Sequence, residues 1–468
     1  MNIFWFRRDL RLTDNPAFAA AVKDDAVLPV YILDKREEFK IGGASQWWLH
    51  HSLESLNKSL DGKLNYFHGS AEEIIPRLAK AHEVKAVYWN KCWEQAFVKT
   101  DEAIEKVLGR SGIECRSHNG LLLWEPGSML KGDGTPYKIF SPFLKLCLSK
   151  DPEQEQIALP KKRTLSPIKP DGSIELDKLG LMPGIKWYKG IEAQWQPGED
   201  GAKDLLQDFV HHKLPRYESQ RNFPAQDVLS RLSPHLHYGE ISPLTMWEAI
   251  NRQHAHGESV KKFISELYWR EFACHLLYHF PDTATKSYSK QLSKLKWRYN
   301  KTLLKKWQQG QTGYPIVDAG MRQLWQTGYM HNRVRMITAS FLIKNLFTDW
   351  RTGADWFLDC LVDADLAVNT MNWQWVAGTG LDASPFFRIF NPLLQSKKFD
   401  REGEYIRQYV PELSKLPVRY LHQPWAAPAK VMDAAGIRLG VDYPRPCVDL
   451  RESSDEALDA YQQTKKTS

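Results

Sequence analysis

The side chains best suited to chemistry gather in the second half of the chain. Within TGYPIVDAGMRQLWQTGYMHNRVRMITASFLIKNLFTDW, Asn332 and Met336 are four residues apart, so a helix would place them on one face with Arg335 beside them. A polar amide next to a soft thioether suits the floor of a ligand pocket. On spacing alone, an ordinary helix with one buried methionine is the favoured explanation.

A pair of carboxylates follows in LVDADLAVNTMNWQWVAGTGLDASPFFRIFNP. Asp363 and Asp365 lie beside an apolar run and close to Asn369. Buried carboxylates must be paired, hydrogen-bonded or bound to a metal. Two alternatives stay open: ion pairs with Arg335 or Arg351, and an Asp-x-Asp site for a divalent cation of the glycosyltransferase kind.

Two further motifs could bind a planar or phosphorylated ligand. In KKFISELYWREFACHLLYHF, Glu266, Trp269 and Arg270 share one side of a helix, where they could grip a planar ligand or simply form a surface ion pair. In SRLSPHLHYGEIS, Ser230 and Ser233 offer hydroxyls to a phosphate. Each motif alone is a weak signal.

Basic and aromatic residues interleave in KLKWRYNKTLLKKW, from Lys294 to Trp307. Such a mixture is typical of a face that attracts phosphates and stacks on bases, and equally of a solvated helix. The chain has no Ser-His-Asp order, P-loop or zinc protease motif that would indicate another chemistry.

An α/β domain is expected first along the chain, because β-rich runs alternate with helical patterns up to about residue 126. The expected strands are Ile3–Phe6, Val27–Ile32, Leu64–Phe67 and Ala86–Trp89, and the expected helices include Ser45–Leu60 and Val98–Arg110. Asp14 or Asn15 should cap the first helix, with Pro16 in its first turn. The preceding loop RRDLRLTDN contains no glycine, so the dinucleotide fingerprint of Rossmann dehydrogenases is absent.

The rest of the chain predicts a connector and an all-α domain. Prolines and glycines accumulate from 127 to 200, with a basic run at Lys161–Arg163. Helical periodicity dominates from 201 to 468, as in Val260–Tyr278, Ala319–Gln326 and Asn332–Leu346. A short polar tail is expected from about Glu452.

Composition limits the class of protein without fixing its function. A chain of 468 residues, 43% hydrophobic and 25% charged, is typical of a soluble globular protein with two domains. The net charge of +7 favours polyanions only modestly. Scattered cysteines, and the lack of a signal peptide or an apolar run long enough to span a bilayer, favour reduced thiols and a cytoplasmic location. The 18 tryptophans suggest stacking or electronic work beyond packing.

Taken together, these segments resemble the photolyase and cryptochrome family, from FWFRRDLRLTDNPAF to FDREGEYIRQYVPEL, and are most similar to its class I cyclobutane pyrimidine dimer photolyases. The resemblance implies a Rossmann-like α/β antenna domain at 1–126, a connector at 127–200, and a helical domain at 201–468 that binds folded FAD and DNA. It implies a lyase in which excited, reduced, anionic FAD passes an electron to a flipped-out dimer.

The resemblance also assigns the FAD site. Residues similar to those that hold the FAD phosphates are Tyr217, Ser230, Arg231, Leu232 and Ser233, while Phe263 stands where a Trp is common and Leu229 replaces a usual hydroxyl residue. Residues similar to the polar set around the isoalloxazine ring are Arg335, Asp363 and Asp365, which displaces the metal hypothesis. Asn369 corresponds to the residue facing flavin N5, where plant-type cryptochromes carry Asp and animal-type ones commonly Cys.

The lesion pocket and the electron relay are implied in the same way. Residues resembling the dimer pocket are Glu266, Trp269, Asn332, Met336 and Trp375, and those near the DNA backbone are Arg221, Arg333 and Gln395. Six-four photolyases place histidines at the positions of Asn332 and Met336, so cyclobutane dimers are the expected substrate. The relay from flavin to surface is Trp373, Trp350 and Trp297.

A second, antenna chromophore is left open. Folate-binding members keep an Asn-Glu pair where this chain has Ala96 and Phe97, which disfavours folate and leaves a deazaflavin, a second flavin or an empty site. The segment GGASQWWLHHSL is expected to line any such ligand.

Three other functions compete with dimer repair: a cryptochrome-type photoreceptor without repair activity, a six-four photolyase, and a light-independent nucleic-acid binding protein. The expected partner is DNA containing pyrimidine dimers. No metal, membrane or obligate protein partner is expected, and the chain should be a monomer.

Overall fold

This computed structural model describes residues 1–152, 156–158 and 163–466. Its first strand, β1 (Asn2–Phe6), is buried along its whole length. Ile3 and Trp5 belong to a core cluster that includes Ile75 and Ile104. The ring of Phe4 contacts Phe18 at 5.2 Å between centroids. Alternate side chains therefore enter two different cores, and helices must cover both faces of the sheet.

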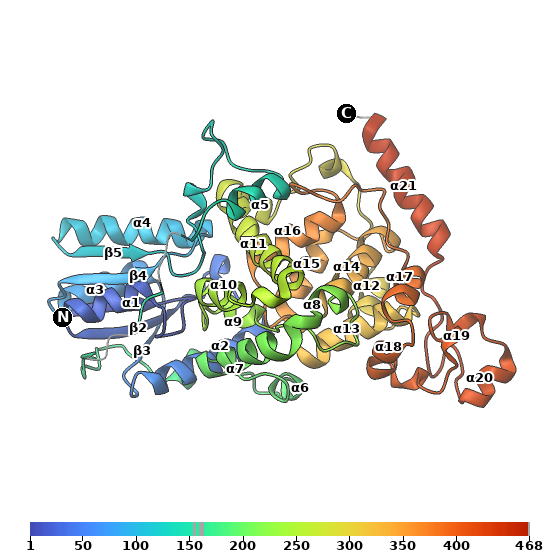
Figure 1. Ribbon diagram of the computed structural model, residues 1–468, viewed down its shortest axis with the longest axis horizontal. Helices are drawn as coiled ribbons and strands as arrows, with labels where there is room; N and C mark the ends of the chain where they lie inside the picture. The colour runs from blue at the N-terminus through green and yellow to red at the C-terminus, as the bar shows by residue number, and fades with distance from the viewer. Residues whose placement is uncertain (153–155, 159–162, 467–468) are drawn as a thin grey trace. The chain divides into compact units, whose positions relative to one another are not determined.

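The sheet has five parallel strands in the order β3-β2-β1-β4-β5 (Figure 1). The remaining strands are β2 (Val27–Leu33), β3 (Asn65–His68), β4 (Ala86–Asn90) and β5 (Glu114–His118). The first four correspond to the predicted strands. The polar sequence ECRSH of β5 gave no hydrophobic signal, because this edge strand is only partly buried.

Crossover helices join the strands, which confirms the predicted α/β class. They are α1 (Pro16–Asp24), α2 (Gly43–Ser59), α3 (Ala71–Ala81) and α4 (Gln95–Arg110). Of the two predicted caps, Asn15 is the one used, since its side chain accepts the Phe18 N–H at 3.0 Å and Pro16 follows in the first turn.

The predicted connector contains more regular structure than its prolines and glycines suggested. It includes α5 (Phe140–Leu148), α6 (Lys189–Glu192) and the start of α7 (Glu199–Asp208). Helix α5 is apolar, with Phe140, Phe143 and Cys147 buried. Of the basic run, Lys161 and Lys162 lie outside the described residues.

The chain divides into two compact units, each assembled from separate stretches. The first unit is Met1–Pro215, Ser230–Pro281 and Val362–Ala367, and the second is Arg216–Leu229, Asp282–Leu361 and Val368–Ser468. Besides the sheet and its helices, the first unit contains α9 (Ser233–His237), α10 (Pro243–Asn251) and α11 (Gly257–His279). The domain limits at 126 and 200 stay a prediction.

The regular structure described in the second unit consists mainly of helices, as expected for the C-terminal half. Its helices are α12 (Lys301–Gln308), α13 (Pro315–Thr327), α14 (Asn332–Ser340), α15 (Trp350–Cys360), α17 (Pro392–Phe399), α18 (Glu404–Tyr409), α19 (Val418–Leu421), α20 (Ala429–Ala435) and α21 (Leu450–Lys466). Helices α8 (Leu214–Gln220) and α16 (Leu366–Ala377) have residues in both units. In the described residues, no helix is both long and apolar enough to cross a membrane.

The prediction of a short polar tail from Glu452 was wrong. Those residues belong to α21, whose Ala457 is fully buried in a cluster with Leu292 and Phe347. The ring of Tyr461 stacks on Phe386, with centroids 5.1 Å apart. One narrow apolar face was enough to fold this segment, although its overall composition is polar.

Candidate active site

The loop before α9 is held in a defined conformation by its own side chains. Arg231 has a positive φ of 56°, which non-glycine residues adopt rarely. Its guanidinium lies 4.2 Å from the centroid of Trp195, and Nη2 donates to Gln194 at 3.3 Å. The Leu232 N–H donates to Ser230 Oγ at 3.4 Å. The Arg231 side chain is thus turned toward Trp195, so the loop's backbone and hydroxyls are the groups suited to phosphates.

The two carboxylates predicted for the flavin site have neutral or histidine partners. Ser233 Oγ donates to Asp363 Oδ2 at 2.7 Å, and His237 Nδ1 lies 3.2 Å from Asp365 Oδ2. Burial would raise the pKa of Asp365, but the hydrogen bond and charge of His237, together with Arg270, lower it below the usual carboxyl range. Asp365 is therefore ionised at neutral pH.

Of the two arginines considered as ion-pair partners for these carboxylates, Arg351 is engaged elsewhere, and a pair with Arg335 stays a prediction. Arg351 forms its ion pair with Asp349 at 2.8 Å. Among the described residues, no group of three or more His, Cys, Asp or Glu side chains is arranged to hold a metal ion.

Asn369 is buried in the second unit, and its amide is oriented by the neighbouring helix. Its side chain is 8% exposed, and Nδ2 donates to the Ala354 carbonyl at 3.1 Å. Because the nitrogen is committed to Ala354, the amide oxygen is the atom suited to accept from an N–H group such as N5–H of a reduced flavin. In the same unit, Arg335 Nε donates to the Met330 carbonyl at 2.7 Å, and Tyr217 is buried with the Arg221 guanidinium 5.3 Å from its ring.

Each unit, taken by itself, holds groups that complement a part of FAD. The first unit supplies hydroxyls and loop amides for a phosphate, the ionised, partly exposed carboxylate of Asp365, and Phe263, whose ring packs on Phe209 at 4.6 Å. The second unit supplies the oriented amide of Asn369. A flavin dinucleotide presents phosphates, N–H donors and apolar ring faces, which are the complements of these groups.

The lesion residues of the first unit lie on α11. Glu266 is partly exposed, and its Oε1 lies 3.3 Å from Lys262 Nζ. Trp269 stacks face to face on Phe140 of α5, with centroids 3.5 Å apart and planes 14° apart. Arg270 Nη1 donates to the Leu121 carbonyl at 2.9 Å, so it is held by the scaffold. Sequence reasoning missed Phe140, because nothing in the connector's composition indicated a partner for Trp269.

The lesion and DNA residues of the second unit lie on α14, α16 and α17. Asn332 is exposed at the first residue of α14, and Met336 is partly buried one turn later. Arg333 Nη1 lies 3.8 Å from Met336 Sδ, and its Nη2 donates to Asn222 Oδ1 at 2.7 Å. Trp375 and Gln395 are partly buried on α16 and α17.

The three relay tryptophans all belong to the second unit and differ in burial. Trp373 is 2% and Trp350 1% exposed, whereas Trp297 is partly exposed. A Cβ atom at Gly353, one turn after Trp350, would lie 2.2 Å from Cη2 of Trp373. Trp373 therefore packs directly on the first turn of α15. Two of the three rings, those of Trp373 and Trp350, are buried, and the third, that of Trp297, reaches solvent.

An open pocket lies at the carboxyl edge of the sheet in the first unit. It encloses about 710 Å³ of non-protein space, including its mouth. The residues lining it include Trp5, Arg7, Arg8, Tyr31, Asp34, Phe39, Ile41, Leu49, Phe97, Thr100 and His237. Phe97 contacts Phe39 at 4.9 Å between centroids. Within GGASQWWLHHSL only Leu49 is among these lining residues.

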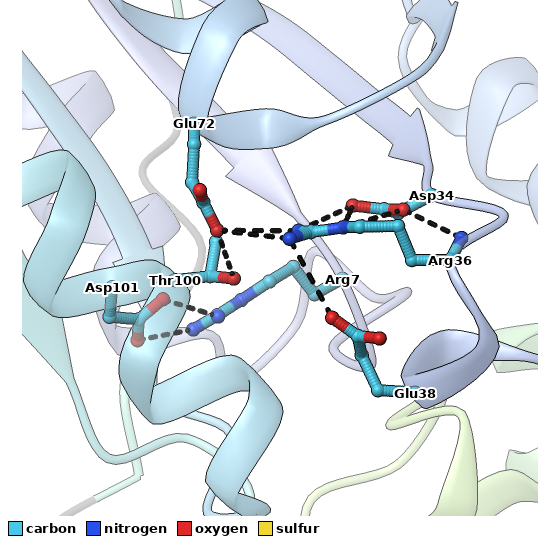
Figure 2. A network of polar contacts seen from close by, with 7 residues as sticks. All are labelled: Arg7, Asp34, Arg36, Glu38, Glu72, Thr100 and Asp101. Atoms are coloured by element: carbon cyan, nitrogen blue, oxygen red, sulfur yellow. Dashed lines mark hydrogen bonds and ion pairs between the residues drawn. The ribbon is translucent and has the colours of Figure 1, made fainter.

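Two charged residues that line this pocket, Arg7 and Asp34, belong to a network of polar contacts (Figure 2). Arg7 Nη1 lies 2.7 Å from Asp101 Oδ1. Arg36 Nη2 forms ion pairs with two carboxylates, Asp34 Oδ2 at 2.7 Å and Glu72 Oε1 at 3.3 Å. Since these pairs link the ends of β1 and β2 to α3 and α4, the lining is fixed by the scaffold.

Two protein-family models match the chain. A model described as DNA photolyase matches residues 2–161, and one described as FAD binding domain of DNA photolyase matches residues 263–463. The chain belongs to the photolyase and cryptochrome family. A deoxyribodipyrimidine photolyase of Agrobacterium fabrum is 46% identical over 99% of this chain and 98% of its own length. Cryptochrome-2 of Arabidopsis thaliana is 36% identical, with 99% of this chain and 79% of the relative covered.

Solved structures agree with the photolyase fold. A bacterial class III photolyase from Agrobacterium tumefaciens superposes with a TM-score of 0.96 at 46% identity, covering 99% of this chain and 98% of that one. An archaeal photolyase from Sulfolobus tokodaii, solved with two FAD molecules, superposes with a TM-score of 0.83 at 33% identity, covering 99% and 100%. These matches support photolyase enzyme activity and an FAD-binding helical domain. The expected class I is not supported, because the structure matched at 46% identity is of class III.

Proposed function

We propose that this protein repairs cyclobutane pyrimidine dimers in DNA by light-driven electron transfer from reduced FAD, as a class III photolyase. The observation that carries the proposal is Asn369, a buried neutral amide with its nitrogen bound to Ala354. An amide that accepts from N5–H without bringing a carboxyl proton favours a fully reduced, anionic flavin.

Each lesion residue would have a defined task. A dimer must leave the duplex to be repaired, and its distorted stacking lowers the cost of flipping. The rings of Trp269 and Trp375 would form apolar walls around the dimer. Asn332 and Met336 would form the floor of the pocket, where they lack the two histidines that six-four photolyases use. Glu266 would hydrogen-bond the base edges and stabilise the dimer radical anion.

FAD, when bound, reduced and excited, would supply the electron that opens the dimer and receive it back afterwards. The chain's own residues would hold and tune that cofactor: the loop Ser230–Ser233 and Tyr217 at the phosphates, and Asp363, Asp365 and Arg335 at the ring system. Trp373, Trp350 and Trp297 would conduct electrons inward during photoreduction.

A cryptochrome-type photoreceptor is the second candidate, favoured by the 36% identity to a plant cryptochrome. It would bind FAD and change redox state in light without repairing DNA. Asn369, in place of the Asp of plant-type cryptochromes, argues for repair.

For the antenna we propose a second flavin or a deazaflavin in the pocket at the carboxyl edge of the sheet. The rings of Phe39 and Phe97, with the guanidinium groups of Arg7 and Arg8 near Phe97, suit a planar aromatic ligand. The Sulfolobus photolyase was solved with two FAD molecules. Chromatography of the chromophores released from the purified protein would identify it. Release of folate would contradict the proposal.

The deciding experiment illuminates the FAD-loaded protein with an oligonucleotide that contains one cyclobutane dimer. Replacing Glu266 with Ala should lower the repair yield on the order of tenfold, because one group that stabilises developing charge is lost, while FAD stays bound. Lys262→Ala, which removes an exposed lysine that pairs with Glu266 and leaves Glu266 in place, is the matched control and should repair normally. Loss of FAD from the Glu266→Ala protein would contradict the role proposed for Glu266. If the wild-type protein absorbs light but the oligonucleotide keeps its dimer, the repair function is wrong.

A further inference from the structure

Helix α14, which carries the proposed lesion residues, starts with an unusual cap. Its N-cap is His331, whose Nδ1 accepts the Arg333 N–H at 3.1 Å. Small neutral or acidic side chains are the usual caps, and acidic ones gain further from the helix dipole. An imidazole can accept at this position only while that ring nitrogen carries no proton.

The cap is fixed from behind by a chain of buried polar groups. The His331 N–H donates to Gln323 Oε1 of α13 at 3.3 Å, and the same oxygen accepts from Tyr405 OH at 2.7 Å. Gln323 Nε2 in turn donates to Tyr409 OH at 3.3 Å. Two neighbouring helices of the second unit, α13 and α18, therefore hold the residue at which α14 begins.

The surroundings of His331 are strongly positive. The residue is 3% exposed. Burial and the charges of Arg333, Arg335 and Arg221 together lower the pKa of its ring to about 3, although a hydrogen bond with the Arg221 backbone acts in the opposite direction. Burial also lowers the pKa of Arg333, and the nearby charges of Arg221 and Arg388 act in the same direction. Arg333 Nη2 is bound to the neutral amide of Asn222 at 2.7 Å. An acidic cap at 331 would place a negative charge among these guanidinium groups.

We propose that His331 is a positioning residue for DNA binding: its neutral ring caps α14 and orients Asn332, Arg333 and Met336 without offsetting the positive charge of the neighbouring arginines. The inference rests on the proposed function, since it takes DNA phosphates as the anions that Arg221 and Arg333 meet. It explains why an imidazole, and not a carboxylate, occupies this cap.

Three substitutions separate the two roles. His331→Asn keeps a neutral cap, His331→Asp keeps the cap and adds a charge, and His331→Ala removes the cap. Asn222→Asp is the matched control, because it places the same negative charge next to Arg333 and leaves the His331 cap unchanged. Each FAD-loaded variant is titrated in the dark with an undamaged and a dimer-containing duplex at several salt concentrations.

We expect His331→Asn to bind both duplexes as the wild type does. His331→Asp and Asn222→Asp should bind both more weakly, with the slope of log K against log salt reduced by about 1, as for one lost phosphate contact. His331→Ala should bind the dimer duplex about fivefold more weakly, as expected for a lost cap, with an unchanged salt slope. Flavin absorption and photoreduction should be the same in every variant.

An unchanged salt slope in His331→Asp would overturn the charge argument. Equal defects in His331→Asn and His331→Ala, or loss of flavin from His331→Asn, would make His331 a packing residue and overturn the capping argument. Failure of the proposed function has a different signature: the wild-type protein would neither prefer the dimer duplex nor repair it. The salt slopes of His331→Asp and Asn222→Asp on the undamaged duplex would still test the charge argument.

Discussion

Trp373 is the residue whose surroundings most directly test the electron relay. It is buried between Phe357, at 4.9 Å between centroids, and the first turn of α15. Replacing Trp373 with Phe keeps an aromatic ring but removes the easily oxidised indole, so photoreduction of oxidised FAD should slow strongly while FAD binding persists. Transient absorption after a blue flash measures this. Trp187→Phe, at an exposed ring in the first unit, is the control and should photoreduce normally.

At the scale of an element, α15 depends on a glycine that no turn requires. A Cβ atom at Gly353 would lie 2.2 Å from Trp373 and 2.6 Å from Leu342. Gly353→Ala should destabilise the protein by about 1–3 kcal/mol through overpacking and disturb photoreduction by displacing Trp373. Thermal unfolding and flash kinetics of one preparation report both effects.

A second helical glycine provides the contrast. Gly109 lies near the end of α4, and a Cβ atom added there would have no neighbour within 4 Å, so Gly109→Ala should stabilise the protein by roughly 0.5–1 kcal/mol. Equal unfolding temperatures for the Gly353→Ala and Gly109→Ala proteins would contradict the packing argument.

At the scale of the whole molecule, neutral buried histidines predict sensitivity to acid. Burial lowers the pKa of His275 in the first unit to about 4 and that of His331 in the second to about 3. Below about pH 6.5 the unfolded chain takes up protons that the folded protein refuses, so the free energy of unfolding falls as pH falls from about 6.5 to 4. His275 alone contributes up to about 3 kcal/mol to this loss.

Thermal unfolding between pH 7 and 4.5 measures the effect. His275→Gln should flatten the dependence of the unfolding temperature on pH, because glutamine has no proton to gain. His254→Gln, at an exposed position, should leave the slope unchanged. A wild-type unfolding temperature that stays constant down to pH 4.5 would be inconsistent with the burial of neutral histidines.

The sequence alone determined the elements with strong periodic patterns. Apolar runs in β1 to β4 and helical periodicity in α11, α13 and α14 follow from local chemistry, as does the capping of α1 by Asn15. The sequence did not predict strand β5 or helix α21, which are both polar. Strand β5 is a half-buried edge strand, and α21 packs only one narrow face against Leu292 and Phe347. Such elements are stabilised by neighbours that are remote in sequence.

The candidate site divides in the same way. Residue types and order were enough to indicate the family and to nominate residues such as Asn369 and Glu266. Only the tertiary structure decided what those side chains touch: Asp365 meets His237, Trp269 meets Phe140, and Arg231 turns to Trp195. The physical reason is that hydrogen bonds and ring stacking act over a few ångströms, between residues that the chain brings together only when it folds.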